Sequence, residues 1–397
     1  MKEHLPAVCT PATTAENWPQ RREQLIELLE QNVFGRTPRG GFETRAELLE
    51  RTAATACDAV RERYRVTVRT QRGEASLHLA LLLPRTAQRV PAVLMISNHD
   101  KAPAPAPKPD EAMLARLMAE APKAWRAETQ RMMAGMHGGT PQLLDIDRDE
   151  AQEYWPAAKI AASGRAAAAF YASEAQPDDQ TRFPEALAAL LTEPGAPRAA
   201  NGIGTLGVWA FAASRMVDVL CGHERIDAGR ISVAGHSRGG KTALWCAAQD
   251  TRIRGVLANN SGCTGAALSR GKRGENVASI NAFFPHWFCP RYGQYAWREA
   301  EMPFDQHMLL AAVAPRLCYV TSGTQDAWSD PDAEWRGICE ASAAWRLLGR
   351  QGLAGDAPRA GEPLRTDGVG YHRREGGHDL TAWDWAQFLA FLEQNNA

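Results

Sequence analysis

The residues best suited to chemistry lie together in one short stretch, 235–242, which reads Gly-His-Ser-Arg-Gly-Gly-Lys-Thr. The apolar run 230–234 precedes it and good helix formers follow, so the stretch is expected to be a sharp turn between a strand and a helix. The glycines on either side of Ser237 match a nucleophile elbow, in which a strained turn lifts a serine hydroxyl above the sheet. The spacing Gly-x-x-x-x-Gly-Lys-Thr, ending in Lys241 and Thr242, equally matches a phosphate-binding loop. The first interpretation predicts a hydrolase and the second a nucleotide-binding protein.

The strands after the turn help to choose between these two interpretations. A phosphate-binding loop works with a second strand that ends in an acid holding Mg²⁺. The next apolar run, 256–258, leads into Asn259 and Asn260, and the run 317–321 reaches Asp326 only several residues later. This context favours the hydrolase. The nucleotide-binding alternative predicts nucleotide affinity that Lys241→Ala abolishes.

A serine hydrolase makes a second demand, on the order of its catalytic residues. Proteins of the α/β-hydrolase fold present Ser, then Asp or Glu, then His, each on a loop after a strand. Ser237, Asp326 and His378 satisfy this order. The serine hydroxyl needs an imidazole to take its proton and a carboxylate to orient that imidazole. We interpret the rival histidines and acids as surface, core or helix-start residues; they are His78, His223, His307, Asp330 and Asp332.

Composition narrows the class of protein. The chain has 397 residues, a formal net charge of −1 and a sequence pI of about 6.8, which indicates neither nucleic acid nor an anionic membrane as a partner. No apolar run approaches the roughly 18 residues that span a bilayer, and the N-terminus has no hydrophobic signal core, so a cytoplasmic location is expected. The eight cysteines show no C-x-x-C spacing. We expect them to be buried free thiols, and we expect no metal or organic cofactor.

The elements that must position these residues follow from hydrophobic periodicity. Short apolar strands alternating with helices predict an α/β-hydrolase fold: a mostly parallel sheet with helices on both faces, preceded by an antiparallel hairpin within 64–83. Residues 1–60 are expected to be a helical segment packed on the core, and 61–397 the hydrolase domain, with an insertion or lid at about 101–155. The expected helices are 15–34, 111–136, 206–220, 332–348 and 381–394; the expected later strands are 91–96, 166–171, 230–234, 256–258 and 317–321, and 370–375 is expected to be a late strand or turn.

The residues around Ser237 resemble those of a known family. The run 235–241 is similar to the Gly-x-Ser-Arg-x-Gly-Lys signature of carbohydrate esterase family fifteen, the glucuronoyl esterases and their bacterial relatives. The likeness covers most of the chain and is weakest from 101 to about 150. Further similar segments are 167–171 with 177–178, 209–215, 285–288, 303–307, 314–316 and 377–378.

The resemblance implies a role for each matching residue. Ser237 would be the nucleophile, His378 the general base and Asp326 the triad acid. Arg238 would help to stabilise the oxyanion, a task for which a permanently charged guanidinium is suited. The implied substrate contacts are Lys241, Trp328 and Trp287.

Two positions depart from the fungal pattern of that family. Fungal members take the triad acid from a glutamate just after the strand that follows the elbow, and this chain has Asn260 there. A glutamate that contacts the sugar in fungal members has Phe284 near its place. We therefore predict a serine carboxylic ester hydrolase acting on a carbohydrate-linked, glucuronoyl-type ester, small or oligosaccharide, through an acyl-enzyme. The alternatives are an acetyl (xylan) esterase of the same fold, a phosphate-loop nucleotide-binding protein and a catalytically silent binding protein.

Overall fold

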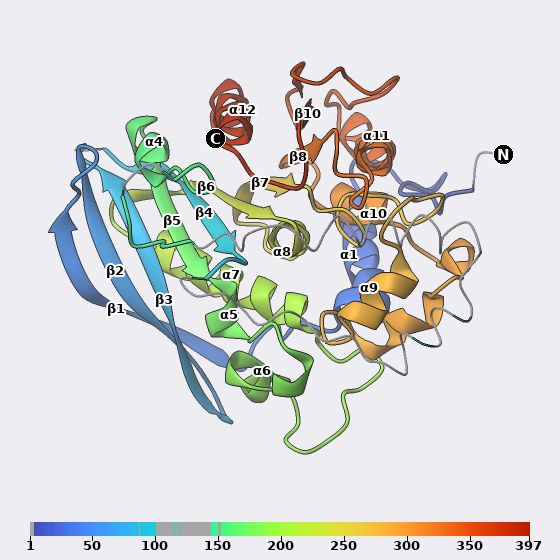
Figure 1. Cartoon of the computed structure of the whole chain (residues 1–397), viewed down its shortest axis with the longest axis horizontal. Helices are drawn as coiled ribbons and strands as arrows, with labels where there is room; N and C mark the ends of the chain where they lie inside the picture. Colours follow the sequence, from blue (N-terminus) through green and yellow to red (C-terminus); the bar gives the residue numbers. More distant parts are fainter. Residues whose placement is uncertain (1–3, 87, 101–114, 116–118, 120–143, 150–151) are drawn as a thin grey trace.

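The computed structural model describes residues 4–86, 88–100, 115, 119, 144–149 and 152–397. One twisted sheet crosses the molecule, with helices packed on both of its faces (Figure 1). Over the described residues the sheet has ten strands in the order β1-β2-β3-β5-β4-β6-β7-β8-β10-β9. The strands are β1 (Phe42–Ala53), β2 (Ala59–Thr70), β3 (Gly73–Pro84), β4 (Val90–Ser97), β5 (Ala166–Tyr171), β6 (Ile226–His236), β7 (Ile253–Asn259), β8 (Leu317–Gly323), β9 (Leu364–Arg365) and β10 (Val369–Arg374).

The centre of the sheet is parallel and its flanks are antiparallel. Strands β5, β4, β6, β7, β8 and β10 run parallel to one another, while β1, β2 and β3 add antiparallel to β5 and β9 adds antiparallel to β10. Every residue of β4 and of β8 is buried, because helices cover both faces of a parallel sheet. The predicted α/β architecture with its N-terminal antiparallel hairpin is confirmed.

Two groups of helices form the outer layers. On one face α7 (Thr205–Gly222) and α8 (Arg238–Gln249) pack on the central strands, and α4 (Ala157–Ala162) and α12 (Ala382–Gln394) cover the other (Figure 1). Buried aromatic side chains fill each layer, with Trp209 and Trp245 on the first face and Trp155 and Trp385 on the second. The remaining helical segments are α1 (Trp18–Leu29), η1 (Glu30–Phe34), α5 (Ala172–Ala175), η2 (Gln180–Arg182), α6 (Ala186–Leu191), α9 (Val277–Phe283), η3 (Pro290–Tyr295), η4 (Glu299–Glu301), α10 (Gln306–Ala311) and α11 (Pro331–Leu347).

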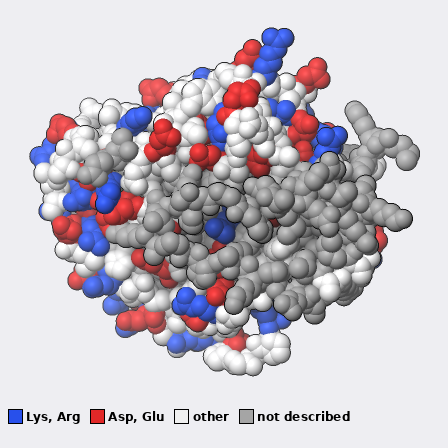
Figure 2. All heavy atoms as spheres, viewed as in Figure 1, with Lys and Arg blue, Asp and Glu red and all other residues white. Residues whose placement is uncertain are grey.

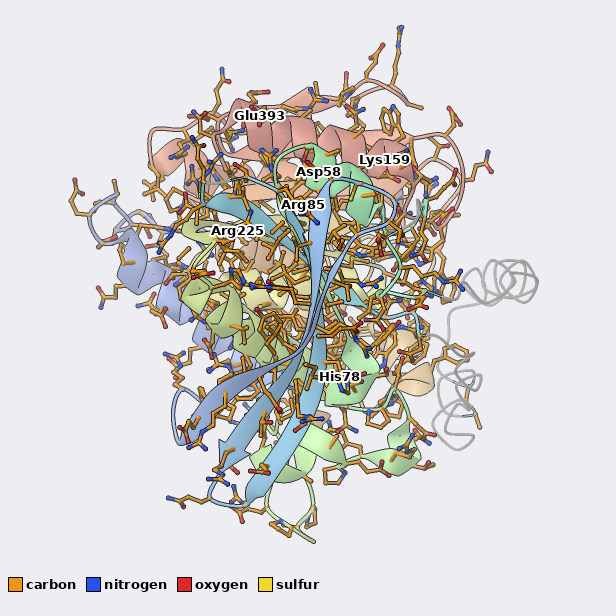
Figure 3. All side chains as sticks on the ribbon, turned by 90° about the vertical axis from the view of Figure 1, so that its left-hand side faces the viewer. Asp58, His78, Arg85, Lys159, Arg225 and Glu393 are labelled. Carbon is orange, nitrogen blue, oxygen red and sulfur yellow. The ribbon has the colours of Figure 1, made fainter. Side chains whose placement is uncertain are left out.

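The expectation of a helical segment over 1–60 is wrong for its second half. Residues 42–53 form β1, which pairs antiparallel with β2, and residue 60 falls inside β2. Most of β1 is exposed and it forms the edge of the sheet, so its sequence lacks the apolar alternation that reveals a half-buried strand. Figure 3 faces this edge and shows Asp58 and Arg85 together near Glu393, with His78 further along β3; Arg85 and Asp58 form an ion pair of 3.3 Å.

The predicted insertion at 101–155 lies mostly outside the described residues, as does the expected helix at 111–136. Its described end belongs to the core: Leu144, Ile146, Tyr154 and Trp155 are buried with the layer that includes α12. The Trp385 indole N–H of α12 donates to the Tyr154 carbonyl at 2.9 Å. This end of the segment is therefore fixed on the sheet.

Helix α7 corrects the expectation about apolar runs. It has 18 residues and a mean hydropathy of 1.2, which by length and composition is enough to cross a membrane. However, 72% of this segment is buried in the protein, and Trp209 lies in the core beneath the sheet. In the described part of the chain, α7 is thus a core helix. On the face shown in Figure 2, acidic and basic side chains are intermixed over the described surface, in agreement with a net charge of −1.

Candidate active site

The turn at Ser237 has the geometry expected of a nucleophile elbow. Strand β6 ends at His236 and α8 begins at Arg238, and the intervening Ser237 has φ 55° and ψ −123°, a strained conformation for a residue with a side chain. The Ser237 N–H donates to the Asn259 carbonyl of β7 at 2.9 Å. A Cβ added at Gly235 would lie 2.1 Å from the carbonyl oxygen of Gly239. The end of β6 and the first turn of α8 are therefore in contact, and only glycine fits at position 235. The predicted strand, turn and helix are confirmed.

The acid and the histidine meet across the ends of neighbouring strands. Asp326 follows β8 and His378 follows β10, and these strands are adjacent and parallel, so their following loops lie at the same edge. The His378 Nδ1 atom is 2.7 Å from Asp326 Oδ2. The His378 ring is centred 4.6 Å from the ring of His236, the residue before Ser237, and 42% of its side chain is exposed. The structure thus brings the three residues predicted from chain order to one place.

Asp326 is held as a carboxylate by several donors. The Asn260 amide donates to Oδ2 at 2.6 Å, and the Ser329 N–H donates to Oδ1 at 3.2 Å. Burial by itself raises the pKa of Asp326, but hydrogen bonds and charge from His378, with the Asn260 and Ser329 donors, bring the pKa well below its ordinary value. Asn260, the residue just after β7, therefore supports Asp326 in its ionised form.

The rival acids and histidines have structural partners. Asp330 caps α11 by accepting from the Ala333 N–H at 3.1 Å, and Asp332 pairs with Arg373 at 2.7 Å, so both are helix-start residues as predicted. His78 lies on the surface beside Glu174, His223 contacts Glu62, and His307 bonds the Pro6 carbonyl at a helix start capped by Asp305.

Arg238 is anchored by a carboxylate that sequence reasoning did not include among the site residues. Its guanidinium Nη1 lies 2.9 Å from Asp178 Oδ2 and its Cζ 5.8 Å from the centre of the Trp287 ring. Asp178 Oδ1 also accepts from the Trp287 indole at 2.5 Å and lies 2.9 Å from His286 Nε2. Burial raises the pKa of Asp178, but the Arg238 charge and these hydrogen bonds lower it more. A guanidinium has five N–H donors, and the ion pair with Asp178 engages only one side of it. The pair therefore orients Arg238 and leaves other N–H donors available.

Lys241 is buried, one helical turn after Ser237. Its ammonium donates to the Ser261 carbonyl at 2.7 Å and lies 3.9 Å from Glu275 Oε2 and 6.0 Å from the Trp287 ring centre. The Lys241 N–H donates to the Ser237 carbonyl at 3.1 Å, so Lys241 lies one turn of α8 away from the elbow serine.

The aromatic candidates and a second acid line the same region. Phe284 stacks on Trp287 with ring centres 3.8 Å apart. Glu275 is a buried carboxylate beside Lys241 that sequence reasoning missed, and its N–H donates to the carbonyl of half-buried Trp328 at 3.1 Å. No spacing in the sequence connects Glu275 to Lys241, so only the folded chain reveals the pair.

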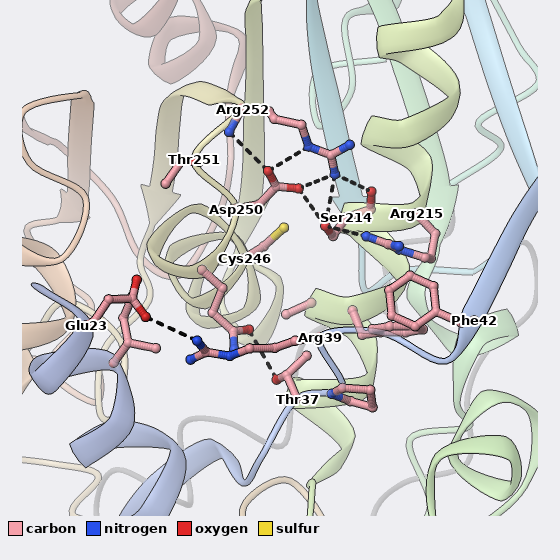
Figure 4. Close-up of a pocket in the computed structure, with 15 residues that line it drawn as sticks. Glu23, Thr37, Arg39, Phe42, Ser214, Arg215, Cys246, Asp250, Thr251 and Arg252 are labelled. Atoms are coloured by element: carbon pink, nitrogen blue, oxygen red, sulfur yellow. Dashed lines mark hydrogen bonds and ion pairs between the residues drawn. The ribbon is translucent and has the colours of Figure 1, made fainter. Parts of the chain in front are cut away.

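The cavity beside α7 and α8 does not compete with this site. A cavity of about 350 Å³ beside α7 and α8 is lined by Arg39, Arg215 and Arg252, but these pair with Glu23 and with carboxylates of Asp218 and Asp250 (Figure 4). Among the residues that the structure describes, no group of three His, Cys, Asp or Glu side chains lies close enough together to hold a metal ion.

All eight cysteines are free thiols.

A serine on a strained turn at the end of the parallel strand β6, with an acid–histidine pair on the loops after β8 and β10, defines a serine hydrolase of the α/β-hydrolase fold. The fold and the site by themselves therefore establish this class of enzyme.

Comparison with known proteins agrees and is more specific. The family of fungal glucuronyl esterases matches residues 198–349. The chain is 34% identical over 393 residues to carbohydrate esterase MZ0003 from an unknown prokaryotic organism, covering 97% of this chain and 87% of that protein. A glucuronoyl esterase from Solibacter usitatus superposes with a TM-score of 0.81 at 32% identity, covering 99% and 98% of the two chains. A promiscuous CE15 esterase from a marine bacterial metagenome gives 0.80 at 30% identity, covering 100% and 98%.

The chain belongs to carbohydrate esterase family 15 (CE15) and is a carboxylic ester hydrolase of the glucuronoyl esterase type.

Proposed function

We propose that the protein cleaves esters in which a glucuronic acid supplies the acyl group, with Ser237 as nucleophile, His378 as base and Asp326 as the acid that orients His378. The observation that carries the proposal is the 2.7 Å contact between His378 Nδ1 and Asp326, on loops next to the Ser237 elbow. With Nδ1–H bound to Asp326, the imidazole presents Nε2 as an acceptor for the serine proton.

The reaction follows in two halves. In the first, Ser237 Oγ bonds to the ester carbonyl carbon while His378 takes the hydroxyl proton, and His378 returns that proton to the departing alcohol oxygen. In the second, water attacks the acyl-enzyme, His378 takes a proton from it, and the uronic acid leaves as Ser237 recovers its proton. Asp326 stays ionised throughout and stabilises the imidazolium that forms in each half.

The negative oxygen that forms in each half needs donors fixed in advance. The Arg238 backbone N–H stands at the start of α8, where the first N–H groups have no partner within the helix. The Arg238 guanidinium, oriented by Asp178 at 2.9 Å, supplies a charged donor. Fixed donors of this kind act most strongly where charge develops in the transition state.

The buried polar groups beside the elbow favour a sugar on the acyl side. Lys241 lies one helical turn after Ser237 and Glu275 lies 3.9 Å from its ammonium, so we place this pair beside the part of the substrate that remains attached to the serine. An acetyl group would bring no hydroxyls to these charges, whereas a uronic acid would bring several. For the same reason the acetyl esterase alternative is the less favoured one.

Two experiments test this proposal. The folded protein is treated with a fluorophosphonate, and the modified peptide is identified by mass spectrometry beside the Ser237→Ala variant. Modification of Ser237 alone in the wild type supports the mechanism, and an unmodified Ser237 refutes it. Hydrolysis of a benzyl glucuronate is then compared with that of an acetylated xylo-oligosaccharide. A higher kcat/KM for the glucuronate ester supports the substrate class, and a higher value for the acetylated sugar contradicts it.

A further inference from the structure

Arg374 contacts the loop that carries His378 at several points. It is the last residue of β10, and only 7% of it is exposed. Its Nη1 donates to the Glu375 carbonyl at 3.2 Å, and its Nη2 donates to the Gly377 carbonyl at 2.8 Å and to the Asp379 carbonyl at 2.6 Å. Arg374 therefore bonds the backbone immediately before and immediately after His378.

The guanidinium is itself held from the other side by Asp384. Arg374 Nε donates to Asp384 Oδ2 at 3.0 Å, and the Asp384 side chain is fully buried. Asp384 lies in the first turn of α12 and is fixed there by the Thr381 N–H and hydroxyl, each at 2.8 Å. Its other oxygen is 2.7 Å from the buried His372 Nε2. Arg374 thus connects α12, a rigid element of the core, to the loop.

The loop before His378 contains two glycines, so its own residues restrict its backbone little and contacts from outside the loop confine it. Gly376 and Gly377 precede His378, and Gly376 has φ +114°. Glycine adopts this φ readily, but it adopts many other conformations just as readily. Fixing each such residue opposes folding by about 1 to 2 kcal/mol of backbone entropy. Bonds from the guanidinium on one side and from the Gln325 N–H to the Gly376 carbonyl at 2.9 Å on the other confine the segment. The second contact comes from the loop that carries Asp326.

We propose that Arg374, anchored by Asp384, is a positioning residue that fixes the backbone on both sides of His378 and so holds the imidazole against Asp326. Arginine is needed because one planar fork reaches the carboxylate and three carbonyls at once, which a lysine ammonium cannot do. The consequence for turnover rests on the proposed function, whereas the effect on the contact between His378 and Asp326 does not.

The test compares Arg374→Lys with Arg373→Lys. Arg373 is the matched control because it precedes Arg374 in the same strand, points to the opposite face and contacts Tyr371, Pro331 and Asp332 instead of the loop. We expect Arg374→Lys to lower kcat for a soluble glucuronate ester by about 100-fold, the effect of a misplacement near 1 Å, with KM changed less than about threefold. Arg373→Lys should keep kcat within about twofold.

A spectroscopic readout accompanies the kinetics. Proton NMR of the full-length protein should show a downfield signal for the His378 Nδ1–H bound to Asp326, assigned by its loss in His378→Ala. This signal should be present in the wild type and in Arg373→Lys, and weakened or lost in folded Arg374→Lys.

Each result decides the proposal. Unchanged kcat and an unchanged downfield signal in Arg374→Lys would overturn it, as would an equal loss in Arg373→Lys. If Arg374→Lys does not fold, Asp384→Asn answers the same question, because it keeps the volume of the anchor and weakens its hold on the guanidinium. If the wild type fails to cleave the ester, the proposed function fails, while the NMR comparison still tests the positioning role.

Discussion

Replacement of the proposed triad acid, Asp326→Asn, is the sharpest test of the proposed catalytic arrangement. The two carboxylate oxygens accept three hydrogen bonds, from His378 and Asn260 on Oδ2 and from the Ser329 N–H on Oδ1. An amide has only one acceptor oxygen, so in either orientation its NH₂ group meets at least one of these donors. The substitution also removes the charge that stabilises the imidazolium and favours the wrong tautomer of His378.

The expected magnitude follows from these losses. We expect kcat to fall about 10³- to 10⁴-fold, as in serine hydrolases that lose the charge of their triad acid, which corresponds to about 4 to 5.5 kcal/mol of transition-state stabilisation. The assay is the initial rate with a saturating glucuronate ester, with circular dichroism to confirm folding. The matched control is Asp332→Asn: this carboxylate is 73% exposed and contacts Arg373, so kcat should stay within about twofold.

A double variant extends the test. Combining Asp326→Asn with Asn260→Asp restores one carboxylate and reverses the hydrogen bond between the two side chains, which is 2.6 Å long in the wild type. We expect it to recover at least about tenfold of the lost kcat, since the charge returns next to its original place. The assignment of the acid would be refuted if Asp326→Asn kept more than about a tenth of the wild-type kcat, or if Asp332→Asn lost as much.

Three further predictions concern the groups around the triad. Asp178→Asn keeps an acceptor for Trp287 but turns an amide toward Arg238, so kcat should fall about 10-fold with little change in KM; a changed KM at constant kcat would contradict this. Lys241→Met should lower kcat/KM for a glucuronate ester about 10- to 100-fold and for 4-nitrophenyl acetate less than about threefold, and equal losses on both would rule out a sugar contact. Burial raises the pKa of Glu334 to about 7, against hydrogen bonds from Ser322 and Gly262. Because folding raises this pKa, the contribution of Glu334 to stability is fully present below its unfolded-state pKa and is lost as the pH rises through its folded-state pKa. Chemical denaturation should therefore show that the free energy of unfolding of the wild type falls by up to about 3 kcal/mol between pH 5 and 8 relative to that of Glu334→Gln. Parallel pH curves for the two proteins would contradict this prediction.

Much of the fold was predictable from local patterns. The strands near the centre of the sheet are continuous apolar runs because helices cover both faces, and such runs are visible in a sequence. Strand β1 was not predictable, because an exposed edge strand has no buried face to impose alternation. The buried end of the segment before α4 was also missed, since Leu144 and Trp155 are separated by residues without a clear period.

The candidate site divides in the same way. The elbow and the candidate triad could be predicted from the sequence alone, because the glycines around Ser237 are a local steric requirement and because the order Ser237, Asp326, His378 follows from the order of the strands. The supporting groups became visible only in the folded protein: Asp178 beside Arg238, Glu275 beside Lys241, and Arg374 around the His378 loop. The physical reason is that these contacts join loops distant along the chain, and their partners are selected by which strand ends the parallel sheet places side by side.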